Sequence, residues 1–576
     1  MAKWLEAVAY FLAADSDPNL ESVADDMIAI IEKAQQSDGY LDTYFIIKEP
    51  HKKWSNLYEC HELYVAGHII EAAVAYYYAT GKRKLLDVAC RLADHIEKIF
   101  GEKSEKSQGY PGHQEIELAL VKLYQATQNE KYLTLSKSFI DRRGGEPNYF
   151  QEEWEHSRER RTFKNNAPVP PPDLKYNQSH QPVSQQETAV GHAVRAVYMY
   201  SAMADLARET GDEELFRSCV RLWENISEKQ LYLTGGIGST HNGEAFSFAY
   251  DLPNDTVYAE TCASVGLIFF AHRMLQLDMD SRYSDVMERA LYNVVLGSAS
   301  LDGKRFFYVN PLEVWPEACN KNPDKQHVKP VRQKWFGCAC CPPNVARLLG
   351  SLSQYLYSTD ENTIYTHLYI GGEAKIKIAG GEMHLKQESN YPWDGHITFT
   401  VLSALPDKER SLGLRIPGWC RKWSVFLNGK PLDALVLQKG YLKITSQWQE
   451  GDVVKLCLEM PVERLQANPQ VRADAGKIAF QRGPLVYCVE ECDNGSNLSA
   501  LSVDPSSSFL AVKDSQLLEN AIAIVGKGMR ETADGWDKSL YRPYEKAEKE
   551  TDIRFIPYFL WGNRGQGEMT VWLRRR

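Results

Sequence analysis

The sequence predicts a multidomain α+β protein in which a helical domain precedes β-sandwich domains. The chain has 576 residues, which is more than one hydrophobic core usually supports, so two to four domains are expected. Apolar residues recur at helical spacing over roughly the first 350 residues, whereas period-two alternation appears after about Ser351. A helical half followed by a strand-rich half is the organisation that these patterns predict.

The helical region repeats a unit in which one helix ends, a tight polar turn follows and a second helix begins. This unit is clearest at residues 78–81, 125–128 and 208–211. The spacing is irregular, which argues against a solenoid of short repeats. Long loops such as residues 235–258 separate the hairpins. We therefore expect a closed ring of paired helices with loops gathered over a central pocket.

The strand-rich region carries alternation at residues 396–401 and a strong hairpin-turn signal in the Asn428-Gly429 pair. Further strands are expected at residues 440–445, 453–458, 477–480, 485–489, 553–560 and 568–573. The predicted domains are a helical domain over 1–355, a first β-sandwich over 356–462 completed by 553–576, and a second β-sandwich over 463–552.

Charge and composition narrow the possible partners. The net charge of −10 argues against nucleic acid, which attracts a basic surface, but is compatible with a small neutral oligosaccharide. No apolar run approaches the roughly 20 residues needed to cross a bilayer, and no signal peptide opens the chain, so no membrane partner and a cytoplasmic location are expected. Twelve cysteines in so long a chain indicate reduced thiols. A homodimer is expected only by analogy with other terminal sandwich domains.

The most unusual local sequence is the cysteine-rich run at residues 337–344. Cys338, Cys340 and Cys341 precede Pro342 and Pro343, which are expected to hold the backbone extended before a helix at residues 345–352. Thiols at a helix start favour the thiolate form because of the helix dipole. Buried, unreactive cysteines are an equally good interpretation of this run taken alone.

A second segment places Glu260 and Cys262 at the start of an apolar helix predicted over residues 263–275. Together with Cys340 and Cys341 they offer one oxygen and three sulfurs, a plausible tetrahedral zinc set. The spacing matches no zinc finger or ribbon, and a purely structural zinc remains an alternative.

Other polar residues are candidates for acid/base chemistry and sugar binding. Glu244 lies in a glycine-rich loop and would act as a general acid only in a dry pocket. The histidines each stand near a predicted helix start, and together with a nearby tyrosine they could bind sugar hydroxyls. These residues are His61, His68, His113, His192 and Tyr308.

With these residues in place, the sequence resembles the zinc-dependent cysteine β-L-arabinofuranosidases of glycoside hydrolase family 127. The motifs that carry the resemblance lie at residues 35–43, 238–241, 250–256, 260–263 and 336–342. The resemblance implies an (α/α)6 barrel followed by β-sandwiches, and a zinc ion bound by Glu260, Cys262, Cys340 and Cys341. It further implies Cys340 as nucleophile, Glu244 as acid/base, and sugar contacts from His61, His113, His192 and Tyr308.

The implied reaction is the retaining release of L-arabinose from non-reducing terminal β-L-arabinofuranosides. Three alternatives stay open: the same fold acting on another plant-glycan pentose, a lyase or epimerase on a similar ring, and a non-catalytic sugar-binding protein with structural zinc. The family carries a lead-in before the segment matching residues 4–6, and this chain lacks it. A shortened barrel is therefore expected, with consequences for its closure, stability and activity.

Overall fold

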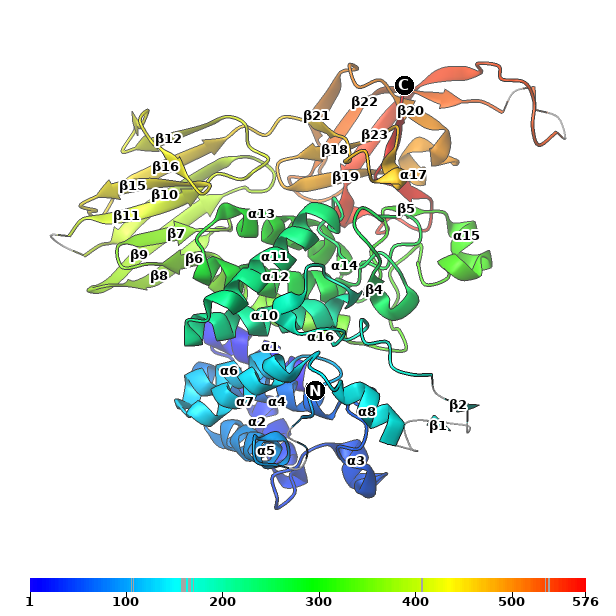
Figure 1. Cartoon of the computed structure of the whole chain (residues 1–576). Helices are drawn as coiled ribbons and strands as arrows, with labels where there is room; N and C mark the ends of the chain where they lie inside the picture. Colours follow the sequence, from blue (N-terminus) through cyan, green and yellow to red (C-terminus); the bar gives the residue numbers. More distant parts are fainter. Residues whose placement is uncertain are drawn as a thin grey trace.

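In the computed structural model of the chain, the helical domain lies below the strand-rich domains as drawn in Figure 1, and helix contacts close it into a ring. The structure describes all residues except 105, 107, 157–161, 164–166, 169, 406–407, 534 and 537–538. For residues 162–163 and 167–168 it describes the backbone only. The predicted fold class, a helical domain followed by β-sheet domains, is confirmed.

Six helices pack in sequence around the ring, each against the next, and the last packs against the first. They are α1 (Ala2–Ala14), α4 (Glu62–Thr80), α6 (Ile116–Thr127), α10 (Ala193–Thr210), α12 (Thr261–Leu277) and α16 (Cys341–Gly350). The contacts of α1 with both α4 and α16 close the ring within this chain.

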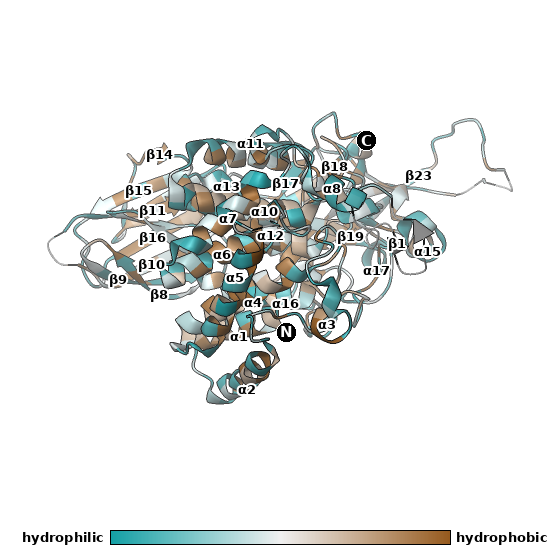
Figure 2. Cartoon of the chain, turned by 60° about the horizontal axis from the view of Figure 1, so that its bottom comes forward, coloured by the Kyte–Doolittle hydropathy of each residue, from teal (hydrophilic) through white to brown (hydrophobic). Residues whose placement is uncertain are grey.

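Five outer helices each pack on the inner helix that precedes them in the chain. They are α2 (Pro18–Ala34), α5 (Lys84–Phe100), α7 (Glu130–Arg142), α11 (Glu213–Lys229) and α13 (Ser281–Arg289). Figure 2 shows polar and apolar residues on the same outer helix, for example on α2, as expected for helices with one face in the core and one in solvent. None of the helices described is long and apolar enough to cross a membrane.

The three predicted turns end inner helices as expected. Gly81, Gln128 and Gly211 follow α4, α6 and α10 and adopt left-handed backbone conformations with φ of 73°, 57° and 69°. A left-handed residue just after a helix satisfies its last carbonyl groups and stops it, and glycine does so without steric cost.

The first strand-rich domain consists of two sheets, and the Asn428-Gly429 turn joins β12 to β13 as predicted. The six-stranded sheet contains β8 (Gly372–Ile378), β9 (Gly381–Ser389), β10 (His396–Ser403), β12 (Trp423–Leu427), β13 (Lys430–Pro431) and β16 (Val453–Leu458). The five-stranded sheet contains β6 (Tyr357–Thr359), β7 (Thr363–Thr366), β11 (Arg410–Arg415), β14 (Leu437–Gln438) and β15 (Tyr441–Ser446).

The second strand-rich domain is organised around one ten-stranded sheet, which also includes a strand from the helical half of the chain. Its strands are β5 (Glu313–Val314), β17 (Glu463–Leu465), β18 (Lys477–Arg482), β19 (Leu485–Glu490), β20 (Leu501–Val503), β21 (Phe509–Lys513), β22 (Ile522–Glu531), β23 (Glu548–Pro557), β24 (Met569–Thr570) and β25 (Leu573–Arg575).

The expectation that residues 553–576 complete the first sandwich is wrong. β23 forms a long antiparallel hairpin with β22, and β24 and β25 pair with β19 and β18. The chain end is therefore hydrogen-bonded into the second domain, because its pairing partners are β5 and strands within residues 477–531. Figure 1 shows the two strand-rich domains as separate bodies above the helical ring.

Candidate active site

The inner helices direct their N-terminal ends toward one end of the ring. His61 and His192 precede the first residues of α4 and α10, and Glu115 precedes α6. Glu260 precedes α12, and Cys340 precedes α16. Because the N-terminus of a helix carries partial positive charge and free N–H groups, this end of the ring suits anionic side chains.

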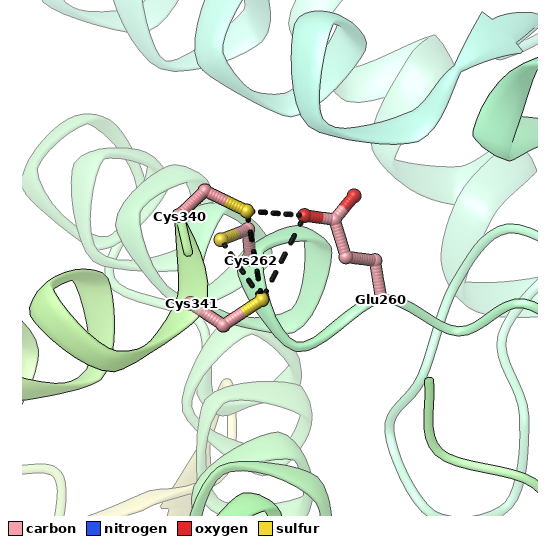
Figure 3. A group of neighbouring side chains, drawn as sticks. All are labelled: Glu260, Cys262, Cys340 and Cys341. Carbon is pink, nitrogen blue, oxygen red and sulfur yellow. Dashed lines mark hydrogen bonds between the residues drawn. The ribbon is translucent and has the colours of Figure 1, made fainter. Parts of the chain in front are cut away.

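Four predicted metal ligands come together at this end, in two adjacent pairs (Figure 3). Glu260 and Cys262 lie at the start of α12, and Cys340 and Cys341 at the start of α16. Cys340 Sγ lies 3.3 Å from Glu260 Oε1 and 3.7 Å from Cys341 Sγ, and the Cys262 and Cys341 sulfurs are 3.6 Å apart. All four ligand atoms lie within 4.8 Å of one another, so the set could hold one metal ion.

The prolines of the cysteine run do not delay the helix, contrary to the prediction. α16 begins at Cys341, and Pro342 and Pro343 occupy its first turn. Proline is tolerated there because those N–H groups have no partner within the helix. The two thiols are thus directly at the helix terminus. All twelve cysteines of the chain are free, and Cys338 is exposed and outside the four-ligand set, although it hydrogen-bonds to Cys340.

The pKa is raised for Glu260 and Cys341 but lowered for Cys262 and Cys340. Burial and the charge of Cys340 raise the pKa of Glu260 well above its ordinary value, and burial does the same to Cys341. Burial also opposes ionisation of Cys262, but hydrogen bonds from the Cys340 and Cys341 thiols lower its pKa to about 6. Glu260 Oε2 is buried without a hydrogen-bond partner. A cation bound among these atoms would relieve both conditions.

The acid/base candidate lies on the other side of Glu260. Glu244, in η3 (Asn242–Glu244), has its carboxylate 3.2 Å from His192 Nε2, lies within 4.8 Å of a Glu260 carboxylate oxygen and is hydrogen-bonded by Tyr258. Burial is the largest single influence and favours its protonated form, but the hydrogen bond and the electrostatic interaction with His192, together with its other neighbours, outweigh burial. The pKa of Glu244 is therefore lowered in the free chain, not raised as expected for a general acid in a dry pocket. The Glu260 carboxylate therefore neighbours both the Cys340 sulfur and the Glu244 carboxylate.

The predicted sugar-contacting residues line the same space. The rings of His61 and His113 lie 5.6 Å apart, and those of His113 and His192 lie 5.5 Å apart. Burial lowers the pKa of His61 to about 4 and places that of His113 well below its ordinary value, so both rings are neutral near pH 7. Tyr308 Oη lies 3.2 Å from Cys340 Sγ. His68, by contrast, is buried deeper in the ring, 2.9 Å from Glu115.

Two further residues lie in this space, and neither had a role of its own among the predicted site residues. Tyr258 bonds to Glu244, and Tyr64, on α4, packs its ring 4.4 Å from that of His113. Tyr258 lies two residues after the motif at residues 250–256, so its position beside that motif could have identified it as a site residue. Tyr64 lies one helical turn after His61, a spacing that places both on one face of a helix.

Comparisons with known proteins agree with this geometry. Residues 1–354 match the family description "Beta-L-arabinofuranosidase, GH127 catalytic domain", residues 363–460 match the GH127 middle domain, and residues 462–574 match the GH127 C-terminal domain. The chain is 41% identical to the non-reducing end β-L-arabinofuranosidase of Bifidobacterium longum subsp. longum, over 100% of this chain and 88% of that protein.

Two solved structures are similar along the whole chain. The crystal structure of a GH127 β-L-arabinofuranosidase from Geobacillus stearothermophilus has 54% identity and a TM-score of 0.96, covering 100% of this chain and 90% of the other. Another GH127 β-arabinofuranosidase has 37% identity and a TM-score of 0.88, covering 100% and 87%. The chain therefore belongs to the GH127 β-L-arabinofuranosidase family of glycoside hydrolases.

Proposed function

We propose that this chain is a retaining, zinc-dependent glycoside hydrolase that releases L-arabinose from non-reducing terminal β-L-arabinofuranosides. Family membership supports the substrate class, since the curated relative is named for that activity. The observation that carries the mechanism is the cluster of Glu260, Cys262, Cys340 and Cys341, with Glu244 beside it at the mouth of the ring.

The spacing of the cluster suits zinc. A tetrahedral zinc with sulfur ligands at about 2.3 Å places two sulfurs about 3.8 Å apart, and a sulfur and an oxygen about 3.6 Å apart. The observed sulfur pairs lie at 3.6 and 3.7 Å, and the sulfur–oxygen pairs at 3.3 and 3.9 Å. The partnerless Glu260 Oε2 also fits a cation at this place, as do the pKa values of Glu260 and Cys341, which burial and the neighbouring ligands raise. When bound, zinc supplies positive charge that keeps the thiol groups ionised at neutral pH.

The reaction follows from the positions of Cys340 and Glu244. The Cys340 sulfur attacks the anomeric carbon, and the glycosidic C–O bond breaks as Glu244 transfers its proton to the leaving oxygen. A water molecule then gives its proton to Glu244 and attacks the same carbon, which breaks the carbon–sulfur bond and restores the thiolate. Two displacements at one carbon retain the configuration.

The sugar is held by groups of both hydrogen-bonding kinds. Neutral His61 and His113 each offer one donor and one acceptor nitrogen, as the hydroxyl groups of a pentose require. Tyr308, hydrogen-bonded to Cys340, keeps its proton because burial raises its pKa, so its hydroxyl can donate to the thiolate and orient it.

The test is hydrolysis of 4-nitrophenyl β-L-arabinofuranoside beside the α-L-arabinofuranoside and β-D-xyloside, with zinc measured in the same sample. We expect one zinc per chain, cleavage of the β-L-arabinofuranoside alone, and a first-formed sugar of β configuration by NMR. A first-formed α sugar would contradict the nucleophile, and binding of L-arabinose without cleavage of any glycoside would instead support the sugar-binding alternative.

The role of Glu244 has a separate signature. Glu244→Gln removes the proton donor but keeps the size of the side chain, so glycosides with poor leaving groups lose more rate than the nitrophenyl glycoside, whose leaving group needs little protonation. Equal losses for a methyl and a nitrophenyl arabinofuranoside would assign the acid role to another residue.

A further inference from the structure

His241 lies on the same tight turn as the acid/base candidate Glu244, and the proposed reaction gives its ring no role. Two backbone hydrogen bonds of 3.0 and 3.1 Å between Thr240 and Ala245 close the turn. Inside it, Gly243 has a left-handed backbone with φ of 73°, and the Glu244 N–H donates to the His241 carbonyl at 3.3 Å. Glycine adopts this conformation without steric cost, which makes so tight a turn possible. The turn therefore holds the backbone of His241 close to that of Glu244.

Four aromatic rings form a continuous series of contacts from the Cys340 sulfur to His241. The Tyr308 hydroxyl lies 3.2 Å from that sulfur, and the Tyr308 ring packs edge-on against Tyr258 with centroids 5.9 Å apart. Tyr258 is stacked with His327 at 6.1 Å, and His327 is stacked with His241 at 4.5 Å. The two stacked contacts have interplanar angles of 25° and 22°. Each contact in the series leads one step further from the proposed nucleophile.

The series runs in the direction that the leaving group takes. In a displacement at the anomeric carbon, the leaving oxygen departs on the side opposite to the nucleophile, and the acid that protonates it lies on that side. Glu244 is this acid in the proposed reaction, and Tyr258, in the middle of the series, hydrogen-bonds to its carboxylate. The part of the substrate beyond the broken bond thus emerges beside Tyr258, where His327 and His241 continue the series.

The two histidines have the chemistry of a surface for a neutral sugar. Both are partly exposed. His327 Nε2 lies 3.2 Å from the Thr256 carbonyl oxygen, which fixes the ring, and burial lowers the pKa of His327, so the ring is neutral near pH 7. The His241 ring makes its stack but no hydrogen bond with any residue that the structure describes, so its nitrogens are available to a ligand. Flat ring faces pack against the C–H groups of a sugar, and ring nitrogens bond its hydroxyl groups.

We propose that His241 and His327 form the binding surface for the leaving group and that this leaving group is a neutral sugar unit. His327 supports the stack, and His241 contacts the sugar through the exposed part of its ring. The inference rests on the proposed function, because the roles of Cys340 and Glu244 give the series its direction. It goes further in naming what the released arabinose is attached to, and it makes His241 a residue that determines specificity.

The test compares substrates that differ only in the leaving group. One is methyl β-L-arabinofuranoside, whose methanol is too small to reach the stack. The others are disaccharides in which a β-L-arabinofuranosyl unit is linked to O2, O3 or O5 of a second pentose. Values of kcat/KM are measured for each, because kcat/KM covers the steps up to departure of the leaving group and not the later attack of water. Both kinds of leaving group need a proton, so the contribution of Glu244 cancels in the ratio of the two values.

We expect the ratio of kcat/KM for the best-cleaved disaccharide to that for the methyl glycoside to fall about tenfold in His241→Ala. His241→Phe keeps a ring face and removes the nitrogens, so the ratio should fall only about threefold. The matched control is His384→Ala. His384 is a half-buried histidine on β9 in the first strand-rich domain, and its loss should leave the ratio unchanged.

The outcomes separate this inference from the proposed function. A wild-type ratio in folded His241→Ala would overturn the inference and leave the proposed function intact, and so would equal losses for both kinds of substrate, which would assign His241 to holding the Glu244 turn. If His241→Ala does not fold, the ratio in His241→Phe decides in the same way. A wild-type chain that cleaves the methyl glycoside but none of the disaccharides would overturn the inference alone. A wild-type chain that cleaves no β-L-arabinofuranoside would refute the proposed function and the inference with it.

Discussion

Two buried ionic clusters of this protein differ in whether their charges are balanced. At the contact between the ring and the first strand-rich domain, Arg415 of β11 is fully buried and paired with Asp285 at 2.6 Å and with Glu288, both on α13. The remaining acceptors of the cluster are bonded too: Tyr391 and Trp419 donate to Glu288 at 2.6 and 3.1 Å. Arg289 adds a second positive charge near both acids, so charge and hydrogen bonding are both satisfied there.

The thiol cluster is the opposite case. Its four groups are all acidic, Glu260 Oε2 has no partner, and burial together with the neighbouring ligands raises the pKa values of Glu260 and Cys341. A satisfied cluster stabilises a contact between domains, whereas an unsatisfied one is prepared for a ligand. We therefore expect substitutions in the Arg415 cluster to lower stability and substitutions in the thiol cluster to lower activity.

The largest effect is expected from Cys340→Ser. A serine hydroxyl in that position is a far weaker nucleophile than a thiolate, so kcat should fall at least about 10⁴-fold, equivalent to ~5.5 kcal/mol of transition-state stabilisation. Thermal unfolding should change little. The measurement is hydrolysis of 4-nitrophenyl β-L-arabinofuranoside, and Cys457→Ser, a half-buried free cysteine on β16, is the control expected to keep full activity. Residual turnover above 10% of wild type would contradict the nucleophile assignment.

The next effect is on stability. Arg415→Met leaves buried Glu288 and half-buried Asp285 without this guanidinium, and removal of one partner of a buried pair costs about 3–5 kcal/mol. We expect a clearly lower midpoint of thermal unfolding, with kcat retained below that temperature. Arg83→Met, which removes the exposed pair with Asp87, should leave the midpoint unchanged. If Arg415→Met instead lost activity at an unchanged midpoint, the contrast between the two clusters would fail.

Much of this organisation could be predicted from the sequence where the signals are local. The turns after α4, α6 and α10 depend on a few adjacent residues, and most of the predicted strands are present. The four candidate ligands were recognised because acids and thiols stand close together in two short segments. Their approach in space is confirmed, whereas the roles assigned to Cys340, Glu244 and the histidines, like the cytoplasmic location and the homodimer, stay predictions.

What could not be predicted depends on contacts between distant segments. The sheet to which residues 553–576 belong is decided by pairing with residues 477–531, and no local pattern specifies a partner strand. Lys3 donates a hydrogen bond to the hydroxyl of Tyr64, 61 residues further along the chain, and lysine side chains normally face solvent. The burial of Lys3 depends on closure of the ring, which requires contacts among all six inner helices.

Asp474 is a buried acid outside both clusters. Among the residues that the structure describes, it has no cation paired with it and does not belong to a group that could bind a metal ion. Burial raises the pKa of Asp474 from 3.8 to about 6, and Asn254 donates a hydrogen bond to it at 2.7 Å across the contact between ring and second strand-rich domain. Between these values the folded chain binds more protons than the unfolded chain, so this group's contribution to stability falls as pH rises from about 4 to 6 and is constant above.

Asp474→Asn should therefore stabilise the protein at pH 7, by up to about 3 kcal/mol, while the bond from Asn254 is kept. The gain should be absent at pH 4, where the wild-type carboxyl is protonated. Midpoints of thermal unfolding at pH 4, 5, 6 and 7 test this, and a gain that is the same at every pH would assign it to packing rather than to charge.

The smallest effect concerns Tyr258, whose hydroxyl hydrogen-bonds to Glu244. This bond favours the ionised carboxylate and so lowers the pKa of Glu244, although the bond from His192 does so more strongly. Tyr258→Phe removes one bond to a charged group, and we expect kcat/KM to fall about tenfold, or ~1.4 kcal/mol. Because the pKa of Glu244 rises, the alkaline limb of the pH profile, along which the acid loses its proton, should move to higher pH.

Tyr365→Phe, which removes a comparable bond to Asp360 at 3.0 Å in the first strand-rich domain, should alter neither quantity. A rate loss in Tyr258→Phe without movement of the alkaline limb would show that Tyr258 contacts the sugar rather than tuning Glu244, which would place it with the histidines and not with the acid.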